Sequence, residues 1–139
     1  VAYVASRECG LQVLDVTDPS AIIRLGGFDT AASVRRVKLV GTTAFVADAA
    51  GLQILNLSNP AAPEWLGGSP VDFVAEDVSV AGSKAYVAAW IGGLQILDVT
   101  DHSRPIPLGG FKSKAWGVDA NDATVYLSSG ADLQVLDAS

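Results

Sequence analysis

Leu11-Gln12-Val13-Leu14-Asp15 is the first of four nearly identical five-residue stretches, and these stretches decide the fold. The other copies are Leu52–Asn56 (LQILN), Leu94–Asp98 (LQILD) and Leu133–Asp137 (LQVLD), so that successive copies begin 41, 42 and 39 residues apart. The Ala-Tyr-Val-Ala stretch at residues 2–5 and the Leu-Gly-Gly stretch at residues 25–27 return with the same period in similar form. The chain is therefore an array of internal repeats.

The repeat length and composition together predict the fold class. A period of about 40–45 residues is typical of a β-propeller blade of four strands, and a helical repeat is the competing interpretation. The apolar segments are short, rich in Val, Ile, Tyr and Phe, and interrupted by Gly, Pro, Asn or Asp. None has the apolar spacing of an amphipathic helix over three turns. We therefore predict an all-β chain of propeller blades, each made of four antiparallel strands.

Each blade is expected to contain strands A to D, counted from the propeller axis outward. In the repeat 74–113 these strands should cover about residues 75–80, 84–88, 94–99 and 106–111. The pattern gives fourteen strands in a single domain over residues 1–139, with repeats at about 1–32, 33–73, 74–113 and 114–139. The first repeat lacks strand A and the last lacks strand D, which leaves about three and a half blades. Propellers close with about 4–8 blades, so we expect a longer chain or a second copy to complete the ring.

Composition excludes several classes of partner. The chain has 139 residues, half of them hydrophobic, and a formal net charge of −6. Nucleic acids and anionic membrane surfaces need clustered Lys and Arg, so neither is an expected partner. No uncharged run approaches the ~20 apolar residues that cross a bilayer, so membrane insertion is not expected either. The single cysteine, Cys9, excludes an internal disulfide and a Cys-based zinc site.

The repeated columns resemble those of a known family. Gly10–Pro19, Gly51–Pro60 and Gly93–Thr100, with Ala2–Ala5 and Ala85–Ala88, are similar to the LVIVD repeat proteins of bacteria and archaea. The resemblance covers nearly the whole chain, although His102 replaces the turn proline and the copy at 121–129 is weaker. It implies a β-propeller of a secreted or cell-surface protein, and it brings no catalytic residues.

The polar columns inside the repeats are best interpreted as structural. The column Asp15, Asn56, Asp98 and Asp137 suggests either calcium ligands or turn caps, and its spread over different blades favours caps. Gln12, Gln53, Gln95 and Gln134 are identical in every copy, so we expect them to make a repeated hydrogen bond within the blade. His102 is the lone histidine and has no partner for a triad or a zinc site, and no cofactor is expected.

A candidate partner-binding surface lies where the repeats differ from one another. Strand A starts and strand B ends on one rim, so the D–A and B–C loops should share that rim. The variable candidates on it are Arg35, Glu76, Trp90 and Trp116, with Arg7, Glu8, Asp48, Asp72 and Phe73 nearby. Exposed Trp and Arg are enriched at binding hot spots, and loops of a rigid scaffold often carry binding. The alternative is that Arg35, Glu76 and Asp77 form ion pairs that only hold the blades in register.

Three functions remain open from the sequence. The first is a noncatalytic binding or scaffold module that engages a protein or glycan through its rim loops. The second is part of a hydrolase or lactonase of the propeller kind, which would need carboxylates converging in the central channel. Glu76, Asp77 and Asp119 are the channel-side carboxylates, and Arg35, Arg36 and Lys38 should neutralise them. The third is a structural spacer.

Overall fold

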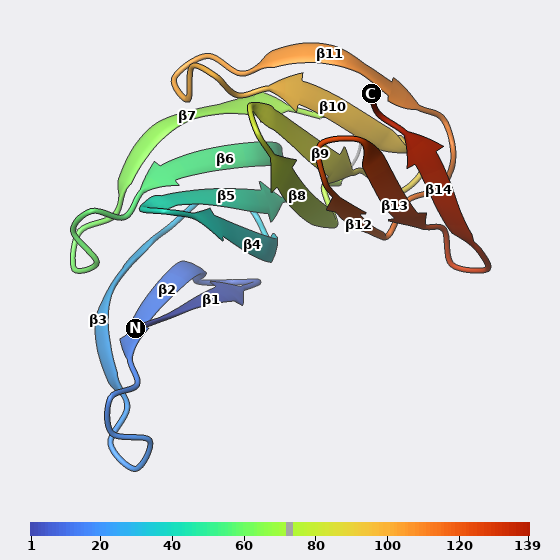
Figure 1. The fold of residues 1–139 in the computed structure, drawn as a ribbon. Helices are drawn as coiled ribbons and strands as arrows, with labels where there is room; N and C mark the ends of the chain where they lie inside the picture. Colours follow the sequence, from blue (N-terminus) through green and yellow to red (C-terminus); the bar gives the residue numbers. More distant parts are fainter. Residues whose placement is uncertain (72–73) are drawn as a thin grey trace.

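The computed structural model describes residues 1–71 and 74–139, and the described residues form strands without any helix. These strands build four antiparallel sheets that follow one another around an arc (Figure 1). The first sheet contains β1 (Ala2–Ser6), β2 (Gly10–Asp15) and β3 (Ile23–Phe28). The second contains β4 (Val34–Val40), β5 (Thr43–Asp48), β6 (Gly51–Asn56) and β7 (Glu64–Pro70). The third contains β8 (Asp77–Ala81), β9 (Lys84–Ala88), β10 (Leu94–Asp98) and β11 (Ile106–Phe111). The fourth contains β12 (Gly117–Ala120), β13 (Thr124–Ser128) and β14 (Leu133–Asp137).

The sheets are the predicted propeller blades, two of them with four strands and the end ones with three. Within each sheet the hydrogen-bonded order follows the chain, so the described part of the chain reads B-C-D, A-B-C-D, A-B-C-D and A-B-C. The strands β4, β8 and β12 are neighbours in space and β3, β7 and β11 lie on the outer side of the arc (Figure 1). β8 begins at Asp77, two residues later than expected. The N–H of Ala75 donates instead to the carbonyl of Asp48 in the previous blade, at 3.2 Å.

Turn chemistry closes each blade as the sequence indicates. Gly41 and Gly82 join strand A to strand B with φ values of 58° and 55°, a region that favours glycine. The column of Asp and Asn caps the turn from strand C to strand D. Oδ1 of Asp15 accepts hydrogen bonds from the N–H and hydroxyl of Thr17 at 2.9 and 2.6 Å, and Oδ1 of Asn56 accepts the same pair from Ser58. The capping interpretation of this column is confirmed.

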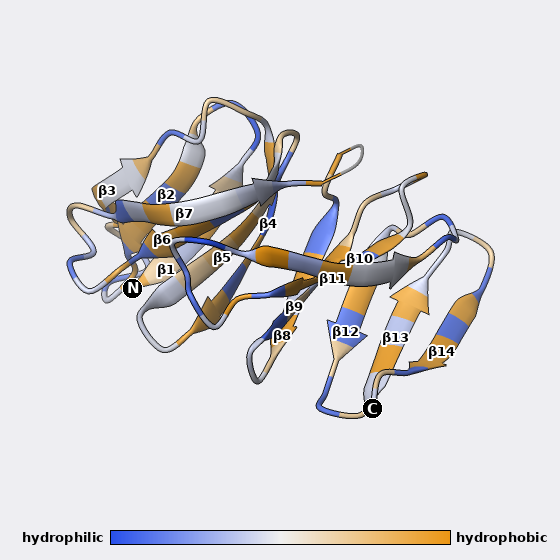
Figure 2. Cartoon of the chain, turned by 90° about the horizontal axis from the view of Figure 1, so that it is seen from above, coloured by the Kyte–Doolittle hydropathy of each residue, from blue (hydrophilic) through white to orange (hydrophobic). Residues whose placement is uncertain are grey.

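The apolar core lies between the blades (Figure 2 shows the sheets side by side). We call the side of a blade that meets the following blade its forward face and the opposite side its backward face. The forward face of the second blade, with Phe45, Leu52 and Ile54, packs on the backward face of the third, with Val87 and Leu97. The same rule joins the first blade to the second and the third to the fourth. This two-sided burial explains why the strands do not alternate cleanly between apolar and polar residues.

The glycine pairs of the D strands allow close approach and also mark a bulge. A Cβ on Gly26 would meet the carbonyl oxygen of Ala61 at 2.5 Å, and one on Gly67 would meet that of His102 at 2.3 Å. The D strand of each of these blades therefore lies directly on the C–D turn of the next blade. Each D strand also carries an extra residue opposite strand C, as at Ile54/Leu55, which is a β-bulge.

Candidate binding rim

The candidate surface is the end of the blades where strand A begins and strand B ends, and we call it the front rim. Strand pairing sets Val34 opposite Asp48, Asp77 opposite Ala88, and Gly117 opposite Ser128. The described front rim therefore consists of the D–A loops 29–33, 71, 74–76 and 112–116 and the B–C loops 7–9, 49–50, 89–93 and 129–132. Asp72 and Phe73, expected on this rim, lie outside the described residues.

Charged side chains link the inner strands at this rim. Nε of Arg35 in β4 lies 4.0 Å from Oε2 of Glu76, and Nε of Arg36 donates to Oδ1 of Asp77 at 2.9 Å. Oδ2 of Asp77 accepts from the backbone N–H of Val118 at 3.0 Å. The geometry matches the alternative from the sequence, in which these groups hold neighbouring blades in register. The Arg36 side chain is exposed, so its ion pair contributes little by itself. The Asp77 carboxylate is nearly buried and accepts hydrogen bonds from Arg36 and from the backbone N–H groups of Val78 and Val118.

A second polar contact continues this line of links between the third and fourth blades. The hydroxyl of Ser79 in β8 donates to Oδ1 of Asp119 in β12 at 3.2 Å, and the N–H of Ala120 donates to the Ser79 hydroxyl at 3.1 Å. The channel-side carboxylates Glu76, Asp77 and Asp119 are thus each paired with a group of a neighbouring inner strand. Within residues 1–71 and 74–139, no group of three or more His, Cys, Asp or Glu side chains is arranged to hold a metal ion.

Trp90 is held at the rim by a strained loop. The B–C loop 89–93 has five residues where its counterpart 49–50 has two. Trp90 adopts φ 46°, which is rare for a bulky side chain. The backbone N–H of Trp90 donates to the carbonyl of Ala115 at 2.9 Å, and the backbone N–H of Ala115 donates to the carbonyl of Trp90 at 2.9 Å. Because this bridge ties the loop to the start of the next blade, the backbone under the indole is fixed.

Trp116 lies beside Trp90 on the neighbouring blade. The backbone N–H of Trp116 donates to the carbonyl of Ser128 at 2.9 Å, and the residue lies directly before β12. The two ring centroids are 5.9 Å apart with an angle of 48° between the ring planes, a tilted arrangement within the range of favourable aromatic pairs. Trp90 is 39% and Trp116 47% exposed. The front rim therefore presents two adjacent and accessible indoles across the boundary between the third and fourth blades.

The four sequence-predicted rim residues form two pairs rather than one cluster. Arg35 and Glu76 pair between the second and third blades, and Trp90 and Trp116 pair between the third and fourth. No signal in the sequence indicates the bridge from Trp90 to Ala115, since only the longer loop with its two glycines marks this B–C connection as different.

Asp48 is a rim carboxylate with a structural task. It is fully buried, and its Oδ1 accepts hydrogen bonds from the N–H groups of Ala50 and Gly51 at 2.8 Å each. Burial raises the pKa of this carboxyl, while the two backbone hydrogen bonds act in the opposite direction. Asp48 therefore closes the short B–C loop of the second blade.

Three members of the glutamine column, Gln12, Gln53 and Gln134, make different hydrogen bonds rather than the repeated one that the sequence suggests. Gln12 donates to the carbonyl of Cys9, Gln53 accepts from the indole N–H of Trp65, and Gln134 donates to the hydroxyl of Ser113. The three partners are a backbone carbonyl, an indole N–H and a hydroxyl. Gln12 and Gln134 thus bond to rim loops, whereas Gln53 bonds to the outer strand β7 of its own blade.

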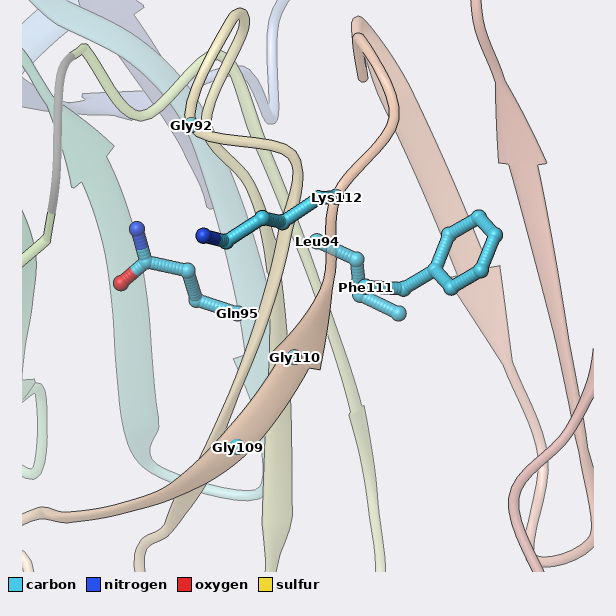
Figure 3. A pocket seen from close by; sticks show the side chains of 7 residues that line it. All are labelled: Gly92, Leu94, Gln95, Gly109, Gly110, Phe111 and Lys112. Carbon is cyan, nitrogen blue, oxygen red and sulfur yellow. The ribbon is translucent and has the colours of Figure 1, made fainter.

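A shallow hollow of about 230 Å³ opens on the third blade (Figure 3). Gly92, Gly109 and Gly110 form its backbone wall, the side chains of Gln95 and Lys112 point to one side, and Leu94 and Phe111 point to the other (Figure 3). Lys112 is the one ionisable residue that lines it. The hollow therefore has no set of groups for acid–base or metal chemistry, and the front rim is the stronger candidate site.

Comparison with known proteins agrees with this architecture. The fold and its repeated blades define a β-propeller-like protein. The profile of the LVIVD repeat matches residues 2–30, 31–68 and 74–112, and the chain belongs to the LVIVD repeat family. No curated protein matches the chain. Among solved structures, the computationally designed Ika4 protein is similar in fold, with a TM-score of 0.77 at 10% identity over 97% of this chain and 83% of that one.

Proposed function

We propose that this chain is a noncatalytic binding module of a secreted or cell-surface protein, and that it engages a protein or glycan through its front rim. The observation that supports the proposal is the pair of exposed indoles, Trp90 and Trp116, on a backbone fixed by the Trp90–Ala115 bridge. A partner meets these rings without having to order them first, and pre-organisation of this kind favours affinity. The secreted or cell-surface compartment is part of this proposal, and the resemblance to LVIVD repeat proteins is the reason for including it.

The chemistry of the rim favours binding over catalysis. The channel-side carboxylates are engaged with Arg35, Arg36 and Ser79, so each already has a partner in an inner strand. The indoles carry no acid–base group but offer large amphipathic surfaces, which stack on apolar side chains and on the faces of sugar rings. Strain at Trp90, a feature that concentrates at ligand-binding positions, is a further reason to place the contact there.

The proposal is tested with ligands selected on the wild-type chain from a displayed peptide library and a glycan array. Trp90→Ala and Trp116→Ala should each weaken the selected ligands by about 1–2 kcal/mol or more, as truncation of hot-spot residues does. Trp65→Ala is the matched control, because Trp65 is 55% exposed but lies on the outer strand β7. Affinity that is unchanged in both rim variants, or lost in the control, would contradict the proposal.

A further inference from the structure

The turn from strand C to strand D carries an amide in the second blade and a carboxylate in the other three. The members of this column are Asn56, Asp15, Asp98 and Asp137, and a Thr or Ser stands two residues after each of them. In the second blade this spacing produces an Asn-x-Ser sequence at residues 56–58, whereas Asn59 is followed by Pro and Asn121 by Asp-Ala. Asn-x-Ser/Thr without a central Pro is the acceptor pattern for N-linked glycans in secreted proteins.

The hydrogen bonds of the turn leave the acceptor nitrogen of Asn56 unused. A backbone N–H can only donate, so the atom that accepts from the N–H of Ser58 at 3.0 Å is Oδ1 of Asn56, and the Ser58 hydroxyl donates to the same atom at 2.7 Å. Nδ2 is then the other end of the amide. Within residues 1–71 and 74–139 it makes no hydrogen bond, and it is not among the buried polar atoms without a partner. Nδ2 therefore reaches solvent.

Asn56 lies on the rim opposite the front rim. β6 runs from the front rim at Gly51 to Asn56, which pairs with Thr43 at the start of β5. The N–H of Leu57 donates to the carbonyl of Thr42 at 2.7 Å, so the turn after β6 lies beside the A–B turn of the same blade. A group attached to Asn56 thus stands on the rim that the tryptophan pair does not occupy.

Electrostatics offers a second reason for the amide. Asn56 lies opposite Glu64 in the pairing of β6 with β7, whereas its counterparts in the first and third blades lie opposite Ile23 and Ile106. A carboxylate at position 56 would face a like charge, which is unfavourable in a cross-strand pair. Repulsion explains the missing charge but makes no use of Nδ2, so an experiment can separate the two reasons.

We propose that Asn56 is an acceptor site for an N-linked glycan, an inference that rests on the secreted or cell-surface compartment of the proposed function. In the transfer, Nδ2 attacks C1 of a sugar carried on a lipid diphosphate. The N–C1 bond forms, the bond from C1 to the diphosphate oxygen breaks, and the lipid diphosphate leaves with the bonding electrons. One proton leaves Nδ2 for a base of the transferase. Oδ1 stays a carbonyl oxygen, so the turn keeps its cap.

The mass of the secreted chain tests the proposal. The chain is exported from a eukaryotic host that transfers N-glycans, and its intact mass is compared with that of the same chain made in a bacterial cytoplasm. The exported chain should be heavier by a glycan that peptide N-glycosidase removes and that peptide mapping places on Asn56. An exported, folded chain at the 14.3 kDa of the bare polypeptide would overturn the proposal and leave repulsion from Glu64 as the reason for the amide.

Variants of the turn identify the acceptor. Asn56→Asp removes the nitrogen and keeps the cap oxygen, and Ser58→Ala removes the hydroxyl of the acceptor pattern, so each should be exported without a glycan. Asn121→Asp is the matched control, because Asn121 also caps a turn through Oδ1 but has no hydroxyl two residues later. A glycan that persists in either turn variant, or that is lost in the control, would contradict the assignment.

A gain of modification tests the geometric part of the argument. The first blade has the same cap, in which Oδ1 of Asp15 accepts from the N–H and the hydroxyl of Thr17. Asp15→Asn therefore creates an acceptor pattern in the same turn geometry and should carry a second glycan. A folded Asp15→Asn chain that still carries one glycan would show that this turn does not present the amide nitrogen.

Ligand binding separates this proposal from that of the front rim. Ligands selected on the wild-type chain are measured on the exported chain and on its Trp90→Ala and Trp116→Ala variants. A glycan on Asn56 with binding that ignores both tryptophans would support the glycan site and contradict the binding role of the front rim. A chain without the glycan whose binding still depends on Trp90 and Trp116 would overturn the glycan site and leave that role intact.

Discussion

Nε of Arg36 in β4 donates a 2.9 Å hydrogen bond to Oδ1 of Asp77 in β8. The other oxygen of the same carboxylate accepts from the N–H of Val118 in β12 at 3.0 Å. A single carboxylate thus joins the inner strands β4, β8 and β12 of three successive blades. The apolar cores between these blades hold the same three blades together.

Asp77→Ala should destabilise the chain by about 1–3 kcal/mol, because it leaves the buried Val118 N–H without an acceptor. Urea unfolding followed by circular dichroism measures the change. Asp132→Ala is the control, since Asp132 is exposed in the loop 129–132, and it should stay within about 0.5 kcal/mol of the wild type. Equal midpoints for the two variants would show that the inner-strand link is unimportant for stability.

Tyr86→Ala should destabilise by about 3–5 kcal/mol, because Tyr86 is 1% exposed in the core between the third and fourth blades. Glu64→Ala, on the exposed start of β7, should change stability by less than about 0.5 kcal/mol. Tyr126 occupies the same repeat position as Tyr86 but is 41% exposed, so Tyr126→Ala should cost clearly less than Tyr86→Ala. Unfolding midpoints that do not follow this order would contradict the assignment of the interblade core.

The turn caps make stability depend on pH. Hydrogen bonds from the side chain and then the backbone of Thr17, Thr100 and Ser139 hold the pKa values of Asp15, Asp98 and Asp137, respectively, below their ordinary value. The unfolded chain therefore binds protons more tightly at these groups. Their contribution to stability should be complete above the ordinary carboxyl pKa of about 3.9 and should be lost as the pH falls through the lower folded-state values.

Asp15→Asn, Asp98→Asn and Asp137→Asn combined should flatten this acid dependence. Asn56 shows that an amide oxygen accepts the same two hydrogen bonds without titrating. Buried Asp48, whose pKa is raised, contributes in the opposite sense, but it is present in both proteins and cancels in the comparison. Urea midpoints between pH 7 and about pH 3 measure the difference, and parallel curves for the two proteins would contradict the role of the caps.

Trp90 and Trp116 should give an exciton-coupled signal in circular dichroism, because their ring centroids are 5.9 Å apart and their ring planes are tilted by 48°. Trp90→Ala and Trp116→Ala should each remove the same feature from the spectrum, whereas Trp65→Ala should leave it in place. Rim variants that alter the spectrum independently of each other would contradict the close pairing.

The sequence predicts the repeats, the strand order and the turn caps because these depend on patterns that each blade repeats. Columns such as Leu52 and Leu94 are buried by the same rule in each interior blade, so period and composition suffice to find them. Tyr126 is 41% exposed although Phe45 and Tyr86 at the same repeat position are buried, because burial depends on a neighbouring blade and not on the residue itself.

The details of the rim were beyond sequence reasoning for a different physical reason. The Trp90–Ala115 bridge and the pairing of Trp90 with Trp116 depend on how one particular loop crosses to the next blade, and no repeat pattern encodes that path. The glutamine column shows the reverse case, since an identical residue meets different local partners in Gln12, Gln53 and Gln134.

The binding role of the front rim is tested most directly by amide hydrogen exchange of the chain with and without a ligand selected on the wild type. Bound ligand should protect the loops 89–93, 112–116 and 129–132 around Trp90 and Trp116, because ordering and burial slow exchange at the contacted backbone. Protection confined to the outer strands β3, β7 and β11, or to the A–B turns at Gly41 and Gly82 on the opposite rim, would contradict it.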